Sequence, residues 1–278
     1  MNISNSIPRL IPLAYPQRAA FVLSRIFTEF PLNSIEKKAN KAYTLENFKT
    51  MTIAPIFAKS DNQYILELWH GPTNTYHDIY AQFLPFLLPE NVLAAVDGDS
   101  CAAMLKGYRN VEHSRIIAFF PRNDIAEFQQ LKIVTQKGDN FMAVGVDGDM
   151  AEIQEKAAQI AKDSPDLSTL DSVPKGRSAP LVACYFSAYC ALVEHKKIKV
   201  DDKISFLLNK SDSLLAESVN LARELGLPVS TDSAVTLTLE AENPNEIEET
   251  FEIFKKSPIA SDAICRVENM ADFVNLML

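Results

Sequence analysis

From residue 91 onward the chain alternates between two spacings of apolar residues. Three short apolar runs have the composition of buried strands: 91–96, 115–120 and 141–146. The segment after each run places its apolar residues at helical spacing: 99–109, 124–136 and 150–162. Strand–helix repetition at these distances predicts a parallel sheet with right-handed crossovers, and therefore an α/β fold.

The regions before and after this stretch continue the same two patterns. Helical spacing predicts helices over 17–30, 32–42, 77–88, 178–195 and 213–225. Residues 63–69 and 204–208 read as strands, and Gly226 is placed to end the helix before it. The last part of the chain again predicts strand, helix, strand and helix: 235–240, 245–256, 262–267 and 269–278.

Glycine is scarce in an otherwise ordinary composition. The 278 residues are 47% hydrophobic and 23% charged, which predicts a folded chain. Only 8 are glycine, where about 19 would be usual. Loops that cradle phosphate need glycine for close backbone approach, and the chain contains neither GxGxxG nor GxxxxGK[ST]. Generic nucleotide-binding motifs are therefore excluded.

Charge and cysteine usage narrow the class further. The net charge of −9 disfavours nucleic acid and anionic membrane as partners. Prolines interrupt the N-terminal residues and the apolar segment 83–96, so we expect no signal peptide, no membrane span and a cytoplasmic location. The four cysteines, Cys101, Cys184, Cys190 and Cys265, lack zinc-ligand spacing and are expected to be buried thiols.

The run LELWHGPTNTYHD at 66–78 is specific enough to indicate a protein family. It resembles the threonine synthase motif, in which an E-L-[WF]-H-G-P-T run is followed by an aromatic residue and then Lys-Asp. Further similar segments occur in the same order: 46–57, 120–149, 185–193 and 204–229. The resemblance covers roughly residues 45 to 229.

The resemblance implies a tryptophan-synthase-β-like fold, PLP fold type II, with parallel sheets flanked by helices. It implies an enzyme that converts phosphohomoserine and water to threonine and phosphate. The implied domains are 1–90 as the N-terminal part of a large domain, 91–165 as a small αβ domain, and 166–278 as the remainder of the large domain. The family continues well beyond the residues after Val229, so we expect a truncated large domain, rebuilt over 230–278.

The departures from the family pattern fall at its functional positions. His77 stands where the motif has its Schiff-base lysine, beside Asp78, and imidazole has no primary amine. In the substrate-binding T-S-G-D-T-G loop, Gly98 and Asp99 are kept and are followed by Ser100. Asp97 stands in place of the serine, and Cys101 in place of the second glycine.

The G-N-F-G loop, which holds the cofactor phosphate, is replaced by Ser211, Asp212 and Ser213. Because a carboxylate repels phosphate and can itself cap the helix that follows, we expect both loops to be vestigial and PLP binding to be lost. The glycine shortage is thus concentrated at the phosphate-facing loops.

We therefore expect a pseudoenzyme that keeps a binding role, toward a partner protein, a second copy or a small amino-acid-like ligand. One alternative is non-PLP chemistry by His77 with Asp78 or Asp99. Another is a lyase that uses a different amine, Lys175 or Lys210. A metal site at His70 and His77 lacks a third ligand at suitable spacing, so no metal is expected.

Overall fold

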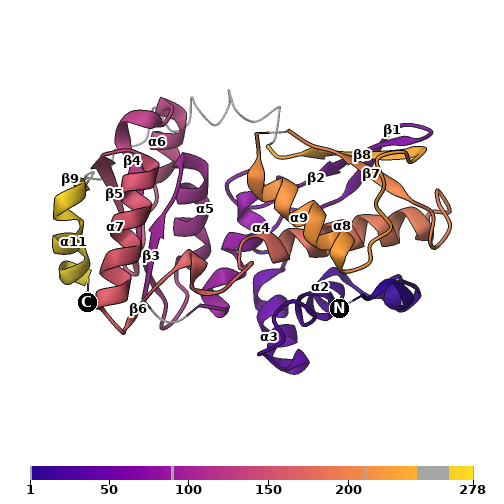
Figure 1. Ribbon diagram of the computed structural model, residues 1–278, viewed down its shortest axis with the longest axis horizontal. Helices are drawn as coiled ribbons and strands as arrows, with labels where there is room; N and C mark the ends of the chain where they lie inside the picture. The colour runs from indigo at the N-terminus through magenta and orange to yellow at the C-terminus, as the bar shows by residue number, and fades with distance from the viewer. Residues whose placement is uncertain (1, 89–90, 210, 243–262, 278) are drawn as a thin grey trace. The chain divides into compact units, whose positions relative to one another are not determined.

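The computed structural model describes residues 2–88, 91–209, 211–242 and 263–277 (Figure 1). The chain forms two compact units, each assembled from two separate stretches. The first unit combines Met1–Phe83 with Lys175–Asn243, and the second combines Leu84–Pro174 with Pro244–Leu278.

A four-stranded sheet and a central buried helix organise the first unit. The strand order is β1 (Ile56–Ser60), β2 (Gln63–Glu67), β8 (Val235–Glu240) and β7 (Ile204–Leu207). Strand β1 runs antiparallel to β2, and the other neighbours are parallel. The helices are α1 (Ile7–Leu10), α2 (Tyr15–Leu23), α3 (Leu32–Ala42), α4 (His77–Ala81), α8 (Ser178–Glu194) and α9 (Ser213–Glu224).

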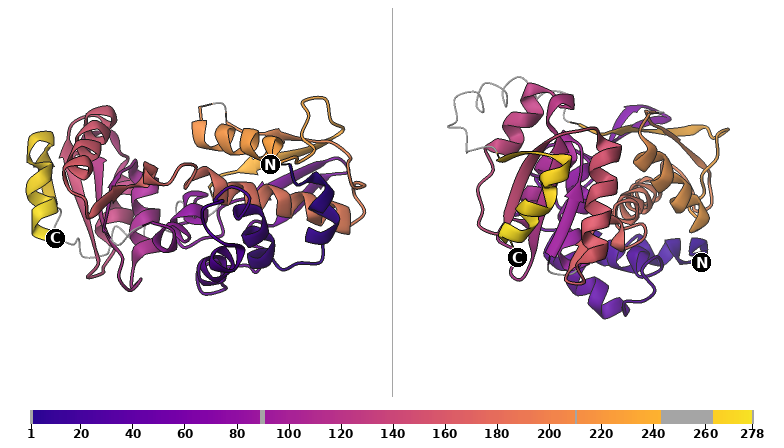
Figure 2. Two further views of the ribbon diagram at one scale, coloured as in Figure 1. Left: turned by 60° about the horizontal axis from the view of Figure 1, so that its bottom comes forward. Right: turned by 60° about the vertical axis from the view of Figure 1, so that its left-hand side comes forward.

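Helix α8 is apolar on nearly every side, as expected for a helix covered all round. It contacts α2, α4 and α9, and its largest side chains, including Tyr185, Phe186 and Tyr189, are fully buried. Both views in Figure 2 show α8 running through the middle of this unit. This helix therefore fixes the positions of the shorter elements around it.

The second unit is a parallel sheet covered by helices on both faces (Figure 1). Its strand order is β6 (Leu167–Thr169), β3 (Asn91–Ala95), β4 (Arg115–Pro121), β5 (Phe141–Asp147) and β9 (Ala263–Arg266). Helices α7 (Met150–Asp163) and α11 (Met270–Met277) share one core with one sheet face. Helix α5 (Gly98–Tyr108) packs on β4 and β5, and α6 (Glu127–Val134) packs against α5.

Five short 3-10 segments complete the described elements: Ser4–Ser6, Leu84–Phe86, Arg122–Asp124, Leu170–Ser172 and Val267–Asn269. All four cysteines are free and buried, as predicted. No helix within the described ranges is both long and apolar enough to cross a membrane.

Several predicted bounds need correction. The helix expected over 17–30 ends at Leu23, where the Ser24 hydroxyl donates to the Phe21 carbonyl at 2.8 Å and the chain turns. The helix expected over 77–88 stops at Ala81 and gives way to a 3-10 turn at Pro85, which has no N–H to donate. Strands β1 and β6 were not predicted, and the helix expected over 245–256 lies outside the described residues.

The last described strand belongs to the second unit. Strand β9 pairs in parallel with β5, so it extends the sheet of the second unit. The second unit thus contains Pro244–Leu278 as well as Leu84–Pro174, and the expected division into 1–90, 91–165 and 166–278 stays a prediction. A short apolar strand does not encode which sheet edge it joins.

Candidate functional site

The segment 66–78 forms a tight turn held by the buried carboxylate of Asp78. One carboxylate oxygen accepts from the Thr73 N–H at 2.9 Å, and the other accepts from the Thr73 hydroxyl at 2.9 Å. Gly71 packs directly on this carboxylate, so a side chain at position 71 would overlap Asp78. Asp78 therefore shapes the turn that precedes His77.

His77 is the first residue of α4 and is half-buried between two tyrosines. Its Nδ1 is hydrogen-bonded to the Tyr80 hydroxyl at 2.9 Å, and its ring lies 4.1 Å from the ring of Tyr76, centroid to centroid. Nearby, His70 Nε2 is hydrogen-bonded to the Glu67 carboxylate at 2.7 Å. The two histidines of the turn are thus each engaged with a different neighbour.

The loop after β3 is closed by its own aspartate. Asp97 is the N-cap of α5, and its carboxylate accepts from the Ser100 N–H at 2.8 Å. A helix N-terminus attracts anions because its first N–H groups lack partners inside the helix. Asp97 supplies both the acceptor and the negative charge, as the sequence predicted.

Asp99 and Gly98 are also engaged with α6. The Asp99 carboxylate accepts from Gln129 Nε2 at 2.6 Å and from the Lys132 ammonium at 3.3 Å. A Cβ on Gly98 would lie 2.8 Å from Gln129 Cβ, so this glycine now serves close packing between two helices. Next to it, burial raises the pKa of the Cys101 thiol, which keeps that thiol protonated.

The loop after β7 repeats the arrangement in the first unit. Asp212 is the N-cap of α9, and its carboxylate accepts from the Leu215 N–H at 2.9 Å. The Asn209 side-chain oxygen accepts from both the backbone N–H and the hydroxyl of Ser211, at 3.2 and 2.9 Å. The N–H groups of Ser211 and Leu215 therefore both donate to side chains of the loop itself.

Comparison with known proteins places these loops in a family context. No family model matches the sequence. Human threonine synthase-like 1 is 29% identical over 246 residues, which cover 79% of this chain and 33% of that protein. Threonine synthase from Escherichia coli K12 is 26% identical over 243 residues, covering 83% and 54%. The chain is homologous to threonine synthase-like 1 and to threonine synthase.

Solved threonine synthases share the fold. The Escherichia coli structure aligns with a TM-score of 0.67 at 22% identity, covering 98% of this chain and 64% of that one. The PLP-bound threonine synthase from Brucella melitensis aligns with a TM-score of 0.68 at 21% identity, covering 98% and 61%. The predicted α/β fold of the PLP type II class is therefore confirmed.

The chain spans a third of threonine synthase-like 1 and about half of the bacterial threonine synthases that it matches.

The remaining candidates are dispersed. Lys175 lies exposed before α8 with a backbone φ of 63°, and Lys210 lies outside the described residues. His113 and His195 are exposed. Within the described part of the chain, no three His, Cys, Asp or Glu side chains gather as a metal-binding group.

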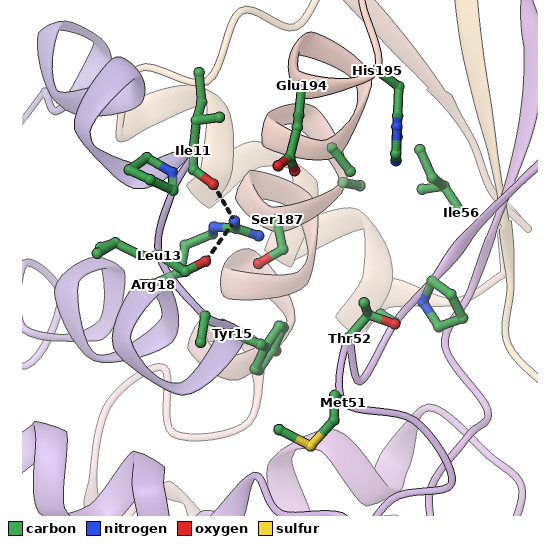
Figure 3. A pocket seen from close by; sticks show the side chains of 16 residues that line it. Ile11, Leu13, Tyr15, Arg18, Met51, Thr52, Ile56, Ser187, Glu194 and His195 are labelled. Atoms are coloured by element: carbon green, nitrogen blue, oxygen red, sulfur yellow. Dashed lines mark hydrogen bonds between the residues drawn. The ribbon is translucent and has the colours of Figure 1, made fainter.

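Sequence reasoning did not identify one cavity in the first unit, which Arg18 and Ser187 line together with segments around residues 11–15, 51–56 and 188–195 (Figure 3). The only sequence signal was an arginine inside an apolar helix, at Arg18 in YPQRAAFVL. A charge at a helix position that faces the core has either a structural or a binding role.

Proposed function

We propose that this chain is a threonine synthase relative that does not perform PLP chemistry at the homologous positions and that retains a binding role. One observation carries the proposal. The helix after each loop that resembles a phosphate-binding loop is N-capped by an aspartate of the chain itself, Asp97 for α5 and Asp212 for α9.

The two caps oppose phosphate binding in two ways. Each carboxylate accepts one of the N–H groups that a phosphate oxygen would need. Each also places a negative charge where a phosphate would bring further negative charge, and like charges at this separation repel. To bind there, a phosphate would have to displace the cap and overcome this repulsion.

The position of the motif lysine gives independent support. His77 offers an imidazole, already hydrogen-bonded to Tyr80, and no primary amine for a carbonyl to condense with. Together with the two capped loops, this residue set does not fit PLP as a covalently held cofactor. No reaction step is therefore assigned to it.

The alternatives have less support. For non-PLP chemistry at His77, Asp78 is a poor partner because both of its carboxylate oxygens accept hydrogen bonds from Thr73. A lyase with another amine would need Lys175 or Lys210 together with a new phosphate site, and Lys175 is exposed. The protein partner, the second copy, the small amino-acid-like ligand and the cytoplasmic location stay predictions.

The proposal is tested by assaying phosphate release from phosphohomoserine in the presence of added PLP. Threonine synthase from Escherichia coli, assayed in parallel, serves as the positive control. We expect no release above the rate with PLP alone. Turnover that depends on this chain and yields equal amounts of threonine and phosphate would contradict the proposal.

A further inference from the structure

The first unit contains a cavity of about 530 Å³ that includes none of the loop or turn residues considered above. Its walls come from the segment between α1 and α2, the segment before β1, and the C-terminal half of α8 (Figure 3). Small-molecule sites are typically concave, mostly apolar and of this size, with a few polar groups that fix orientation. The polar groups of this cavity therefore determine which ligand would fit it.

The first polar group is a buried guanidinium. Arg18 is 9% exposed, and it donates to the carbonyls of Leu10 and Ile11 at 3.0 Å and of Leu13 at 2.8 Å. These bonds use Nε and one terminal nitrogen. Within the described residues no carboxylate pairs with Arg18. Buried charges are normally compensated by an opposite charge, so Arg18 is suited to an anionic ligand as its ion-pair partner.

The second polar group is the buried hydroxyl of Ser187. Ser187, on α8, is 5% exposed, and its Oγ has no hydrogen-bond partner in the described part of the chain. Leaving a buried hydroxyl unpaired costs free energy, so such groups in native proteins call for an explanation. Figure 3 shows the Ser187 hydroxyl and the Arg18 guanidinium turned toward each other at one end of the cavity.

The rest of the cavity adds an apolar wall and one negative charge. Ile11, Leu13 and Ile56 line it with aliphatic side chains. Glu194, the last residue of α8, points its carboxylate into the same space from above (Figure 3). The Arg18 guanidinium and the Ser187 hydroxyl thus lie at one end of the cavity, and the Glu194 carboxylate lies apart from them. The aliphatic side chains line the space beside these groups.

We propose that this cavity binds a small α-amino acid with an apolar side chain. The ligand carboxylate accepts from the remaining terminal nitrogen of Arg18 and from Ser187, and so forms an ion pair with the buried guanidinium. The ligand ammonium faces Glu194, and the side chain packs on the aliphatic wall. Binding in this cavity does not depend on the proposed loss of PLP chemistry. That proposal concerns His77, Asp97 and Asp212, none of which lines the cavity.

The test is calorimetric titration of the full chain with three probes that share one hydrocarbon body: L-leucine, 4-methylpentanoate and isoamylamine. We expect L-leucine to bind at one site with a dissociation constant below about 1 mM. 4-Methylpentanoate should bind more weakly, and isoamylamine should not bind. The proposal is overturned if none of the probes binds, if isoamylamine binds as tightly as L-leucine, or if 4-methylpentanoate binds more tightly.

Variants locate the binding in the cavity. Ser187→Ala should weaken L-leucine about fivefold, and it leaves the fold intact because its hydroxyl has no partner. Arg18→Gln, which still offers an amide to the carbonyls, should abolish binding. Ala191→Phe places a large side chain in the cavity from α8 and should also abolish binding. It provides a second test of the site if the Arg18 variant does not fold. Unchanged L-leucine binding in Ser187→Ala and Ala191→Phe would overturn the proposal.

Glu194 and Glu224 form a matched pair for the ammonium. Each is an exposed glutamate at the last position of its helix, and only Glu194 lines the cavity. Glu194→Gln should weaken L-leucine and leave 4-methylpentanoate no weaker, whereas Glu224→Gln should change neither. Equal effects of the two substitutions would overturn the role given to Glu194.

Discussion

The carboxylate of Asp212 accepts a hydrogen bond from the Leu215 N–H at 2.9 Å and thereby caps α9, the helix that follows the loop after β7. The same relationship joins Asp97 to Ser100 in the other unit, at 2.8 Å. In both units, an aspartate of the loop thus caps the helix that follows it. The N-termini of α5 and α9 each attract negative charge, and the carboxylates of Asp97 and Asp212 supply it.

Removing either cap should destabilise the unit that contains it. Asp212→Ala and Asp97→Ala should each cost about 1 kcal/mol, because an N–H loses its acceptor and the helix N-terminus loses a favourable charge. Asp212→Asn and Asp97→Asn are the matched controls, since asparagine caps about as well. Urea unfolding followed by circular dichroism measures the difference. Identical midpoints for the alanine and asparagine variants would argue against capping.

Restoring the lysine alone should not restore the cofactor site. His77→Lys supplies the amine but leaves both loops capped by Asp97 and Asp212, so we expect no visible absorption band of bound PLP beyond background. His113→Lys, at an exposed histidine, measures the background from surface lysines. A saturable band that is specific to His77→Lys would show that the phosphate position is still available.

The turn before His77 should depend on Asp78. Asp78→Ala leaves the Thr73 N–H and hydroxyl buried without their acceptor, which should cost about 2–4 kcal/mol. Asp61→Ala, an exposed aspartate in the same unit, should change the free energy of unfolding by less than about 0.5 kcal/mol. Equal unfolding midpoints for the two variants would contradict the role given to Asp78.

The stability of the first unit should fall at alkaline pH because of Cys184. Burial raises the pKa of this thiol from 9.0 to about 12, and its contact with the Tyr15 hydroxyl at 3.0 Å partly opposes the rise. As the pH rises, the thiol ionises in the unfolded chain before it ionises in the folded chain. The contribution of buried Cys184 to the free energy of unfolding is therefore complete below pH 9.0 and is lost as the pH rises toward 12.

Cys184→Ser removes this titration. Relative to the variant, wild type should lose about 1 kcal/mol of stability between pH 9 and pH 10. Urea unfolding at a series of pH values measures the slope, and Ser187→Ala, a non-titrating change one turn along α8, should keep the wild-type slope. Parallel pH profiles for wild type and Cys184→Ser would contradict the prediction.

Local features of the fold were predictable because their signals lie within a few residues. Asp97 and Asp212 precede helical segments by the spacing that N-capping requires, and strands β3, β4 and β5 are continuous apolar runs between helices. Strand β1 was not predicted because most of its residues are exposed and it lacks an apolar face. Strand β6 was not predicted because it has only three residues.

The cavity was not predictable for a different reason. Arg18 and Ser187 meet only because α2 packs on α8, and no local pattern encodes that contact. The partner of β9 is set in the same way by tertiary packing. Helix periodicity places both polar residues on buried surfaces but does not say that they share one space.

The most direct test of the central claim is borohydride reduction after incubation with PLP, followed by peptide mass spectrometry. If the chain has lost the cofactor site, only scattered, substoichiometric labelling of exposed lysines is expected, unchanged in His77→Ala. Stoichiometric labelling of a single lysine, for example Lys175 or Lys210, that is suppressed by inorganic phosphate would contradict the account.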